Sequence, residues 1–209
     1  MTTAAVRIEN LSFTYPRQTR ACFTHLSLEI TEGERFGLFG PNGAGKTTLM
    51  NCMTGLLNYQ QGSIRLLGNE IAHHKKSVNR LFGFVPQDFS FYQELSPAEN
   101  LAFFGAWAGL NKSTIKRKTD ELLDILGLAD VRDRKVQEFS GGMKRRVNLA
   151  IGVIHEPRIL FLDEPTTGLD PQARRRFWEL VRMIRKRGKT IVLTTHYMEE
   201  AYELCDEIA

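Results

Sequence analysis

The sequence predicts an α/β fold in which a mixed, mainly parallel sheet is joined to an N-terminal antiparallel β subdomain and an inserted helical subdomain. A first observation is a set of short apolar runs typical of buried strands, at residues 36–39, 81–85 and 159–162, together with a β-branched run at 190–195 that also predicts a strand. A second is the alternation of apolar and polar residues over 6–15 and 26–30, which indicates half-exposed strands. A third is a helical pattern from Ser96 to Arg134. At 209 residues the chain is long enough to form one such domain, residues 1–209.

A glycine-rich segment follows the apolar run 36–39 and leads into a helix. It reads Gly40-Pro41-Asn42-Gly43-Ala44-Gly45-Lys46-Thr47-Thr48 and matches the pattern G-x-x-x-x-G-K-[ST] in full. Its glycines let the backbone curl around an anion, and the helix N-terminus favours negative charge. Lys46 can reach the β- and γ-phosphates of a nucleotide, and the Thr47 hydroxyl can coordinate Mg²⁺. The segment therefore predicts a P-loop NTPase core that binds a nucleotide through residues 40–48; a tight turn with a chance lysine is the alternative.

Two further candidate residues stand where predicted strands end. Tyr15 closes the first strand, where its ring could stack on a nucleotide base, although alone it would be an ordinary strand tyrosine. Gln87 follows the run 81–85, and loops at strand ends carry function disproportionately. Between the two, residues 62–68 are expected to form another strand.

The helical insertion begins with a clear start signal. Ser96-Pro97-Ala98-Glu99 fits a capping box with proline at the first helical position. A second helix has its apolar residues on one face between Ile115 and Leu126 and stops at Gly127. We expect the whole helical subdomain to extend from about 88 to 155.

Ser140-Gly141-Gly142 opens the last helix of this subdomain. Ser140 is placed to cap the helix that carries Val147 and Ile154 on its apolar face. The glycines make this a second helix N-terminus able to receive an anion. In isolation, S-G-G is a weak motif.

Two carboxylates end the strand predicted at 159–162. Asp163 should bind Mg²⁺ directly or through water, and Glu164 can orient or deprotonate the water that attacks the γ-phosphate. The alternative is a solvated acidic turn.

His196 leaves the strand at 190–195 on the same sheet edge, where a contact with the γ-phosphate is favoured over a place in the core.

Composition restricts the class of protein. Apolar residues make up 42% and charged residues 25%, and no apolar run is long enough to span a bilayer or to act as a secretory signal. We therefore expect a soluble domain whose site faces the cytosol. The formal charge of +4 is concentrated at 144–146, 174–176 and 182–189, which we interpret as solvated helix faces because they lack the interleaved aromatic residues of a single-strand binder.

Neither the cysteines nor the adjacent histidines suggest a further site. Cys22, Cys52 and Cys205 are odd in number and far apart, which argues against a disulfide framework and against a zinc site. We expect buried, reduced thiols. His73 and His74 lie in a polar stretch with no third metal ligand nearby.

In this order and spacing, the motifs closely resemble those of the nucleotide-binding subunit of an ABC transporter over nearly the whole chain. The resemblance implies that Tyr15 stacks on adenine, that Gln87 senses Mg²⁺ and the membrane partner, and that Glu164 is the catalytic carboxylate. It also implies that His196 contacts the γ-phosphate and that Asp170 lies at a dimer interface. Two subunits close head to tail in this family, so ATP held by one loop 40–48 is capped by the other subunit's Ser140, Gly141 and Gly142.

The chain departs from the family pattern in two places. Phe139 and Met143 replace the first and last residues of the usual L-S-G-G-Q signature, while Ser140 and Gly142 remain. The segment 143–146 is similar to the branch that exports drugs, ions or lipids. The sequence stops at Ala209, where the family usually continues, so a truncated C-terminus is expected.

The resemblance implies an ATPase motor that uses ATP and Mg²⁺ to drive a separate transmembrane permease. Such a subunit is cytoplasmic, peripheral on the inner face of the membrane, and paired with a second copy or a homologous ATPase subunit; no nucleic acid partner is expected. Two other classes remain open at this point. One is a soluble ABC ATPase that acts on nucleic acid or ribosomes, and the other is a P-loop enzyme such as a small-molecule kinase.

Overall fold

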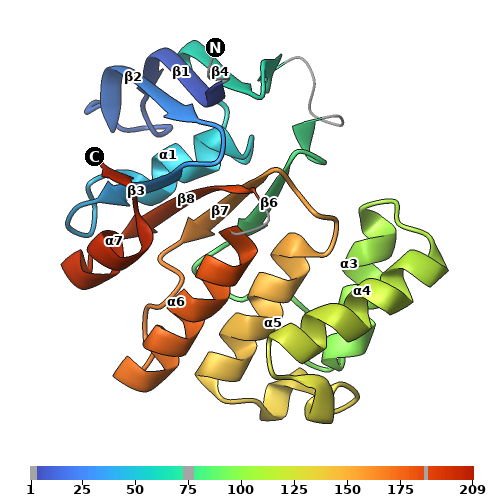
Figure 1. Ribbon diagram of the computed structural model, residues 1–209. Coiled ribbons are helices and arrows are strands. Elements are labelled where there is room, and N and C mark those ends of the chain that lie inside the picture. Colours follow the sequence, from blue (N-terminus) through green and yellow to red (C-terminus); the bar gives the residue numbers. More distant parts are fainter. Residues whose placement is uncertain (1–3, 73–77, 186–187) are drawn as a thin grey trace.

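The computed structural model describes residues 4–72, 78–185 and 188–209 (Figure 1). The strands are β1 (Ala4–Phe13), β2 (Phe23–Thr31), β3 (Arg35–Phe39), β4 (Gln61–Leu66), β5 (Asn69–Glu70), β6 (Phe82–Val85), β7 (Ile159–Asp163), β8 (Thr190–Thr195) and β9 (Glu207–Ile208). The helices are α1 (Lys46–Met53), α3 (Pro97–Trp107), α4 (Lys112–Ile125), α5 (Gly141–Val153), α6 (Pro171–Arg185) and α7 (Met198–Leu204), with short 3₁₀ turns at Ala129–Val131 and Val136–Glu138. His73, His74 and part of the basic segment 182–189 lie outside the described residues.

Two sheets form the framework, and their arrangement confirms the predicted fold class. The N-terminal sheet is antiparallel with strand order β2-β1-β4-β5, and the central sheet has the order β6-β7-β8-β3-β9 with parallel pairing. Phe39 of β3 pairs with Thr195 of β8, and Asp163 of β7 pairs with Thr194. The carboxyl ends of these strands therefore meet at one edge, where ligands bind in open α/β sheets.

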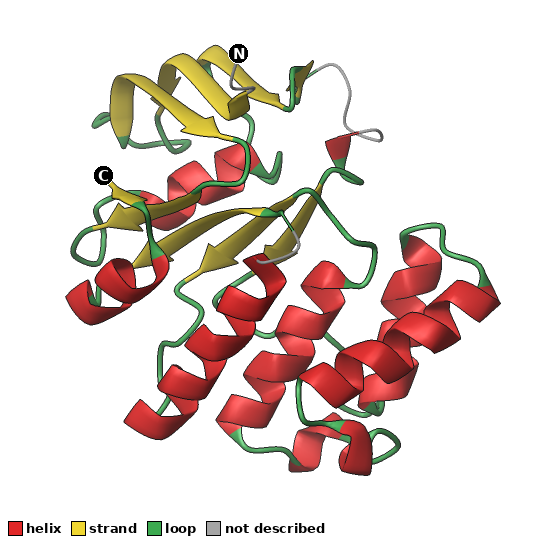
Figure 2. Ribbon diagram, in the orientation of Figure 1, coloured by secondary structure: helices red, strands yellow, loops and turns green. Residues whose placement is uncertain are grey.

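The hydrophobic core lies on both faces of the central sheet. Successive residues of a strand point to opposite faces, so β7 divides its side chains: Ile159 and Phe161 join the core shared with α1, while Leu160 and Leu162 join the core beneath α5 and α6. Figure 2 shows the resulting layers, with α1 between the two sheets and the longer helices on the other side of the central sheet. This burial on both faces explains why residues 159–162 of β7 form a continuous apolar run.

The helical subdomain is inserted between β6 and β7, as the sequence predicts. Its first helix starts with the expected capping box, because Ser96 Oγ accepts a hydrogen bond from the Glu99 amide and Glu99 Oε2 accepts one from the Ser96 amide. Asn100 is fully buried and holds the preceding loop through both the amide and the carbonyl of Tyr92. The subdomain is therefore fixed to the loop that leaves β6.

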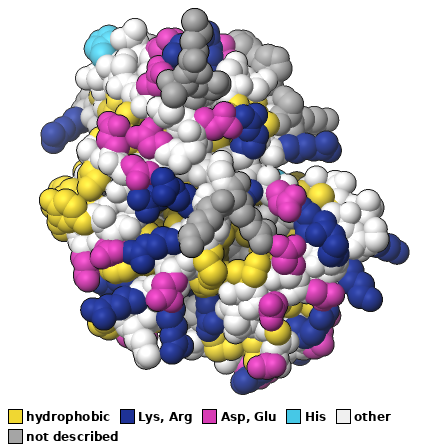
Figure 3. All heavy atoms as spheres, viewed as in Figure 1, with side chains coloured by type: hydrophobic (Ala, Val, Ile, Leu, Met, Phe, Trp, Pro, Cys, Tyr) yellow, Lys and Arg dark blue, Asp and Glu magenta, His cyan; other side chains and the backbone are white. Residues whose placement is uncertain are grey.

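Two expectations about exposure need correction. Arg145 is buried and Arg174 is half-buried, so the basic clusters are only in part solvated helix faces. Arg145 lies on the side of α5 that faces the chain after β6, where it donates a hydrogen bond to the Gln87 carbonyl. The Arg174 guanidinium stacks on Tyr197, with Cζ 4.1 Å from the ring centroid. The surface in Figure 3 shows basic and acidic side chains interspersed on one face.

The cysteines differ from expectation in their burial. All three are free thiols, but only Cys52 is fully buried, whereas Cys22 and Cys205 are partly exposed. Cys22 lies on a loop, where the sequence has no periodic pattern from which burial can be predicted. Burial raises the pKa of Cys52 to about 11 and that of Cys205 to about 12, so both remain thiols at neutral pH.

Candidate functional site

The glycine-rich segment forms the turn from β3 to α1. Gly43 and Gly45 adopt positive φ angles of 84° and 94°, which glycine reaches without the strain that other residues suffer. A Cβ atom at position 45 would also stand 2.9 Å from Cys22 Sγ. Because α1 begins at Lys46, its N-terminal dipole faces the loop. The backbone here is therefore suited to hold an anion.

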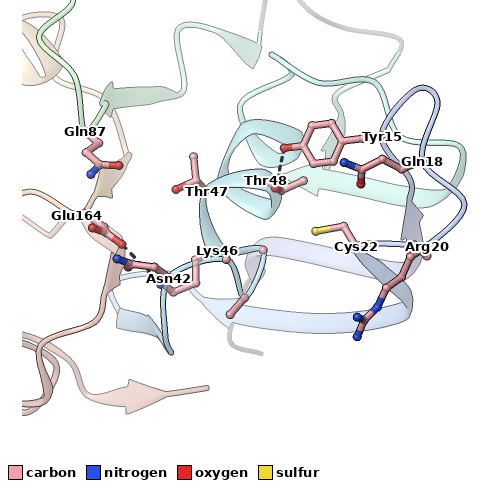
Figure 4. A pocket seen from close by; sticks show the side chains of 14 residues that line it. Tyr15, Gln18, Arg20, Cys22, Asn42, Lys46, Thr47, Thr48, Gln87 and Glu164 are labelled. Carbon is pink, nitrogen blue, oxygen red and sulfur yellow. Dashed lines mark hydrogen bonds and ion pairs between the residues drawn. The ribbon is translucent and has the colours of Figure 1, made fainter.

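A cavity of about 780 Å³ opens in front of this loop, a volume typical of small-molecule sites (Figure 4). The predicted site residues that line it are Tyr15, Asn42, Gly43, Ala44, Gly45, Lys46, Thr47, Thr48, Gln87 and Glu164. Gly40 and Pro41 contribute their carbonyl oxygens, which accept hydrogen bonds from Lys46 Nζ at 2.8 and 3.0 Å.

Lys46 and Glu164 face each other across the cavity floor. Lys46 Nζ lies 3.6 Å from Glu164 Oε1, and each side chain is only 8% exposed. Charges in so dry a site interact far more strongly than at the surface. The ammonium is therefore a strongly interacting cation in the wall of this cavity, beside the loop.

Thr47 and Asp163 come together as predicted for a Mg²⁺ site. Thr47 Oγ1 donates a hydrogen bond to Asp163 Oδ1 at 3.1 Å, and Thr194 Oγ1 donates to the same oxygen at 2.5 Å. Burial raises the pKa of the Asp163 carboxyl, while the bonds from Thr194 and Thr47 oppose that rise. A hydroxyl and a carboxylate oxygen this close together could both bind one Mg²⁺ ion. In nucleotide sites Mg²⁺ usually has few protein ligands, and phosphate oxygens and water supply the others.

Glu164 is held in a conformation that its residue type rarely adopts. Its φ angle is 43°, in the left-handed region, and its amide donates to both the carbonyl and the hydroxyl oxygen of Thr194. The carboxylate accepts a hydrogen bond from Thr167 Oγ1 at 3.1 Å, and His196 Nδ1 lies 3.2 Å from the same Oε2 atom. Strained backbone of this kind is concentrated at active sites.

Tyr15 lies at the far end of the cavity from Glu164 (Figure 4). Its hydroxyl group is 2.8 Å from Thr48 Oγ1, and its ring packs edge-on against Phe13. This wall is completed by four residues that sequence reasoning missed, Gln18, Arg20, Ala21 and Cys22. They lie on the loop between β1 and β2, and only the packing of one sheet over α1 brings that loop to the cavity.

The remaining predicted residues lie at a second, separate pocket of about 280 Å³. Ser140, Gly141, Gly142 and Asp170 line it, so one chain does not bring them to Lys46. Ser140 Oγ accepts a hydrogen bond from the Met143 amide, which confirms the predicted cap of α5. Asp170 Oδ1 accepts hydrogen bonds from two amides at the start of α6.

Sequence reasoning missed the supports behind the site. Thr194 Oγ1 donates a hydrogen bond to Asp163 Oδ1 and accepts one from the Glu164 amide, yet in the sequence it is one of several β-branched residues of a strand. Glu200 is fully buried on α7, where its Oε1 accepts hydrogen bonds from Thr166 Oγ1 at 2.7 Å and Trp178 Nε1 at 3.0 Å. Only its position four residues after His196 in the sequence could have drawn notice.

None of the helices in the described parts of the chain combines the length and the apolar character needed to cross a bilayer.

Comparison with known families gives one clear match. The family model described as "ABC transporter" matches residues 23–167, which is more than half of the chain.

Curated relatives extend this similarity. The chain is 38% identical over 203 residues to the linearmycin resistance ATP-binding protein LnrL of Bacillus subtilis, covering 97% of this chain and 65% of that protein. It is 45% identical over 183 residues to the Nod factor export ATP-binding protein I of Rhizobium sp. (strain N33), covering 88% and 60%. The chain thus spans between half and two thirds of the length of these relatives.

Solved structures agree in fold. The chain superposes with a TM-score of 0.85 and 29% identity on a structure titled as the ATP-binding subunit of an ABC transporter, covering 97% of this chain and 83% of that one. The TM-score is 0.88, with 28% identity and coverage of 99% and 84%, for cbiO1 of Clostridium perfringens, titled as part of the ABC transporter complex cbiONQ.

Proposed function

The chain belongs to the ABC transporter family of ATP-binding domains, and on that premise we propose that it hydrolyses ATP to drive a separate membrane permease, in the direction of export. The observation that carries the proposal is that Lys46, Thr47 and Glu164 line one cavity at the N-terminus of α1, with Asp163 hydrogen-bonded to Thr47 behind it. A structural turn has no need of two nearly buried carboxylate residues facing a buried ammonium group.

Each residue has a distinct part in the proposed reaction. The loop backbone and Lys46 hold the β- and γ-phosphates, and Tyr15 stacks on the adenine. Thr47 and Asp163, with Gln87, hold Mg²⁺, which neutralises negative charge on the phosphates when bound. Glu164 orients the attacking water and takes its proton, and His196, beside Glu164, contacts the γ-phosphate.

Two chains complete the sites in this proposal. The pocket with Ser140, Gly142 and Asp170 is separate from Lys46 in one chain, which agrees with a head-to-tail dimer in which each chain caps the partner's ATP. The glycines of this helix start let a phosphate approach the backbone closely. The partner is a second copy or a homologous ATPase subunit.

Export through a permease is supported by the relatives. Nod factor export and linearmycin resistance are the roles named for two of them, and cbiO1 is named as part of a larger transporter complex. In this proposal the chain lies on the inner face of the membrane and is held there by its permease. Action on nucleic acid is less favoured, because Arg145 is buried and Arg182 and Arg185 are paired with acidic residues.

The test of the proposed chemistry is Glu164→Gln, which keeps the size and shape of the side chain but replaces one carboxylate oxygen by an amide donor and so removes the base. We expect Mg-ATP binding to persist while hydrolysis slows by roughly 10²- to 10⁴-fold, the usual contribution of a general base. ATP-bound dimers should accumulate, because opening follows hydrolysis. Single-turnover hydrolysis and size-exclusion chromatography measure the two effects, and turnover at the wild-type rate would place the base elsewhere.

A further inference from the structure

Arg145 is a buried cation with an unusual set of partners. It lies on the second turn of α5 with 5% of its surface exposed. Among the described residues, no carboxylate lies within ion-pairing distance of its guanidinium group. A buried charge normally has an ionic partner, because removing it from water costs several kcal/mol. Some other interaction must therefore account for its place.

Within the described residues, the hydrogen bonds and the ring contact of Arg145 all go to one short segment after β6. Its Nη1 atom donates hydrogen bonds to the carbonyl oxygens of Gln87 at 2.6 Å and Pro86 at 3.3 Å. Its Cζ atom stands 4.9 Å from the centroid of the Phe89 ring, within the range of a cation–π contact. Asn148, one turn further along α5, donates to the Pro86 carbonyl at 3.2 Å. The segment 86–89 is thus attached to α5 by backbone and ring contacts.

This attachment joins the two pockets. The Gln87 side chain lines the cavity of Lys46 and Glu164, while the start of α5, at Ser140 to Gly142, lines the second pocket. Burial lowers the pKa of the Arg145 guanidinium, and the negative charges of Asp88, Asp163 and Glu200 act against that effect from beyond ion-pairing distance. Arg145 thus links the segment that carries Gln87, at the first pocket, to the helix that begins at the second pocket.

We propose that Arg145 is a positioning residue that fixes the Gln87 backbone to helix α5, so that Gln87 reaches the Mg²⁺ site in a geometry set by the partner-facing helix. This inference takes the roles of the two pockets from the proposed function and rests on it to that extent. A movement of α5 toward a partner would be transmitted to Gln87 through the guanidinium group.

The first test needs no nucleotide. Arg145→Met keeps an unbranched, buried side chain but removes the donors. For the Gln87 and Asp88 amides of the wild type we expect ¹⁵N order parameters of ~0.85, as in rigid backbone. In the variant we expect values below ~0.6, as in flexible backbone. Lys118→Met is the matched control, because Lys118 is also a buried cation of the helical subdomain but pairs with Glu156. It should leave residues 87 and 88 rigid.

The second test measures the contribution of Mg²⁺ to ATP binding, taken as the ratio of the dissociation constants in EDTA and in Mg²⁺. We expect Arg145→Met to lower this ratio roughly tenfold and to leave the dissociation constant in EDTA unchanged. Loss of a residue that supports a metal ligand typically weakens metal affinity by at least this factor. Gln87→Ala should lower it similarly. The double variant should lose no more than Gln87→Ala alone, since Arg145 acts through Gln87.

Arg145→Lys covers the case in which the methionine variant does not fold. The ammonium group keeps the charge and can reach one carbonyl, so we expect order parameters for residues 87 and 88 between ~0.6 and ~0.85 and a Mg²⁺ ratio between those of the wild type and of Gln87→Ala. Rigid residues 87 and 88 in a folded Arg145 variant would overturn the proposal, as would losses that add in the double variant. A wild-type protein that bound no ATP would instead refute the proposed function, and the order parameters would still decide the role of Arg145.

Discussion

In the proposed function, Lys46 is the residue on which we expect nucleotide binding to depend most. Its ammonium group is nearly buried, donates to the carbonyl oxygens of Gly40 and Pro41, and lies 3.6 Å from Glu164. These contacts hold the side chain extended along the loop instead of free in solvent. A phosphate there would meet a positive charge that has already lost most of its water, so little ordering remains to be done on binding.

Replacement of Lys46 by alanine should therefore weaken ATP binding while the loop backbone survives. Loss of a charge-assisted hydrogen bond of about 1.5–3 kcal/mol corresponds to a roughly 10- to 100-fold rise in the dissociation constant. Equilibrium binding in EDTA measures this without any contribution from Mg²⁺. Lys118→Ala, which removes a buried lysine distant from the cavity, should bind ATP normally. Near-normal affinity in the Lys46 variant would count strongly against this site.

Helix α7, helix α6 and the loop after β7 are joined by one buried carboxyl group. Glu200 Oε1 accepts hydrogen bonds from Thr166 of the loop and Trp178 of α6, while its other oxygen has no hydrogen-bond partner among the described residues. The loop runs from Glu164 to Asp170 and so connects the two pockets. The position of this loop therefore depends on Glu200, which lies on a different helix from the loop's neighbour α6.

Thr166→Val tests the strength of this junction. The change leaves Glu200 with fewer hydrogen bonds in a fully buried place, so the free energy of unfolding should fall by about 1–3 kcal/mol. Thr119→Val is the matched control, since Thr119 is also buried but its hydroxyl has no hydrogen-bond partner in the described structure. Denaturant titration should show a clear loss for the first variant and little change for the second. Equal stability of the two variants would exclude the junction as a support.

Strand β9 is attached beside β3 by a bidentate ion pair. Arg35 donates through Nη2 and Nε to the two Asp206 carboxylate oxygens at 2.6 and 3.2 Å, and its amide also donates to Oδ2. The hydrogen bond from the Arg35 side chain is the main cause that lowers the pKa of Asp206 in the folded protein. The pair therefore stabilises the fold above the ordinary aspartate pKa, and this contribution is lost as the pH falls through the lower folded value.

Asp206→Asn should make the pH dependence visible. At pH 7 we expect a loss of about 1 kcal/mol or less in the free energy of unfolding, since the pair is partly exposed and screened. The difference from the wild type should shrink as the pH drops below about 4 and vanish below the folded pKa. Asp130→Asn, at an exposed position, serves as the control. A difference that stayed constant from pH 7 to pH 3 would show that the charge of Asp206 has no such role.

At the scale of the molecule, the sequence was sufficient wherever local pattern and chemistry coincide. The loop 40–48, the carboxylates that end β7 and the histidine that ends β8 were predictable, because strand ends of a parallel sheet meet at one edge. The burial of Arg145 was not, because it depends on where the chain after β6 packs against α5. The left-handed backbone of Glu164 likewise depends on hydrogen bonds to Thr194, thirty residues away.

The central claim is that each ATP site is shared between two chains, and mixed dimers test it most directly. One chain carries Lys46→Ala and the other Gly142→Asp, whose carboxylate repels a γ-phosphate where glycine allowed close approach. A Cβ atom at 142 would stand 3.3 Å from Ala173 Cβ, so Gly142→Ala is included to separate crowding from charge. Each homodimer of the two charge-altering variants should fail to occlude ATP.

In the mixed dimer, one composite site carries both lesions, but the other joins an intact Lys46 to an intact Gly142. The measurement is nucleotide occlusion by dimers whose mixed composition is independently confirmed, since hydrolysis can require both sites. The account predicts that occlusion is restored at about one nucleotide per mixed dimer, half the capacity of a dimer with two shared sites. No occlusion in verified mixed dimers would contradict it and leave Ser140-Gly141-Gly142 as an ordinary helix cap.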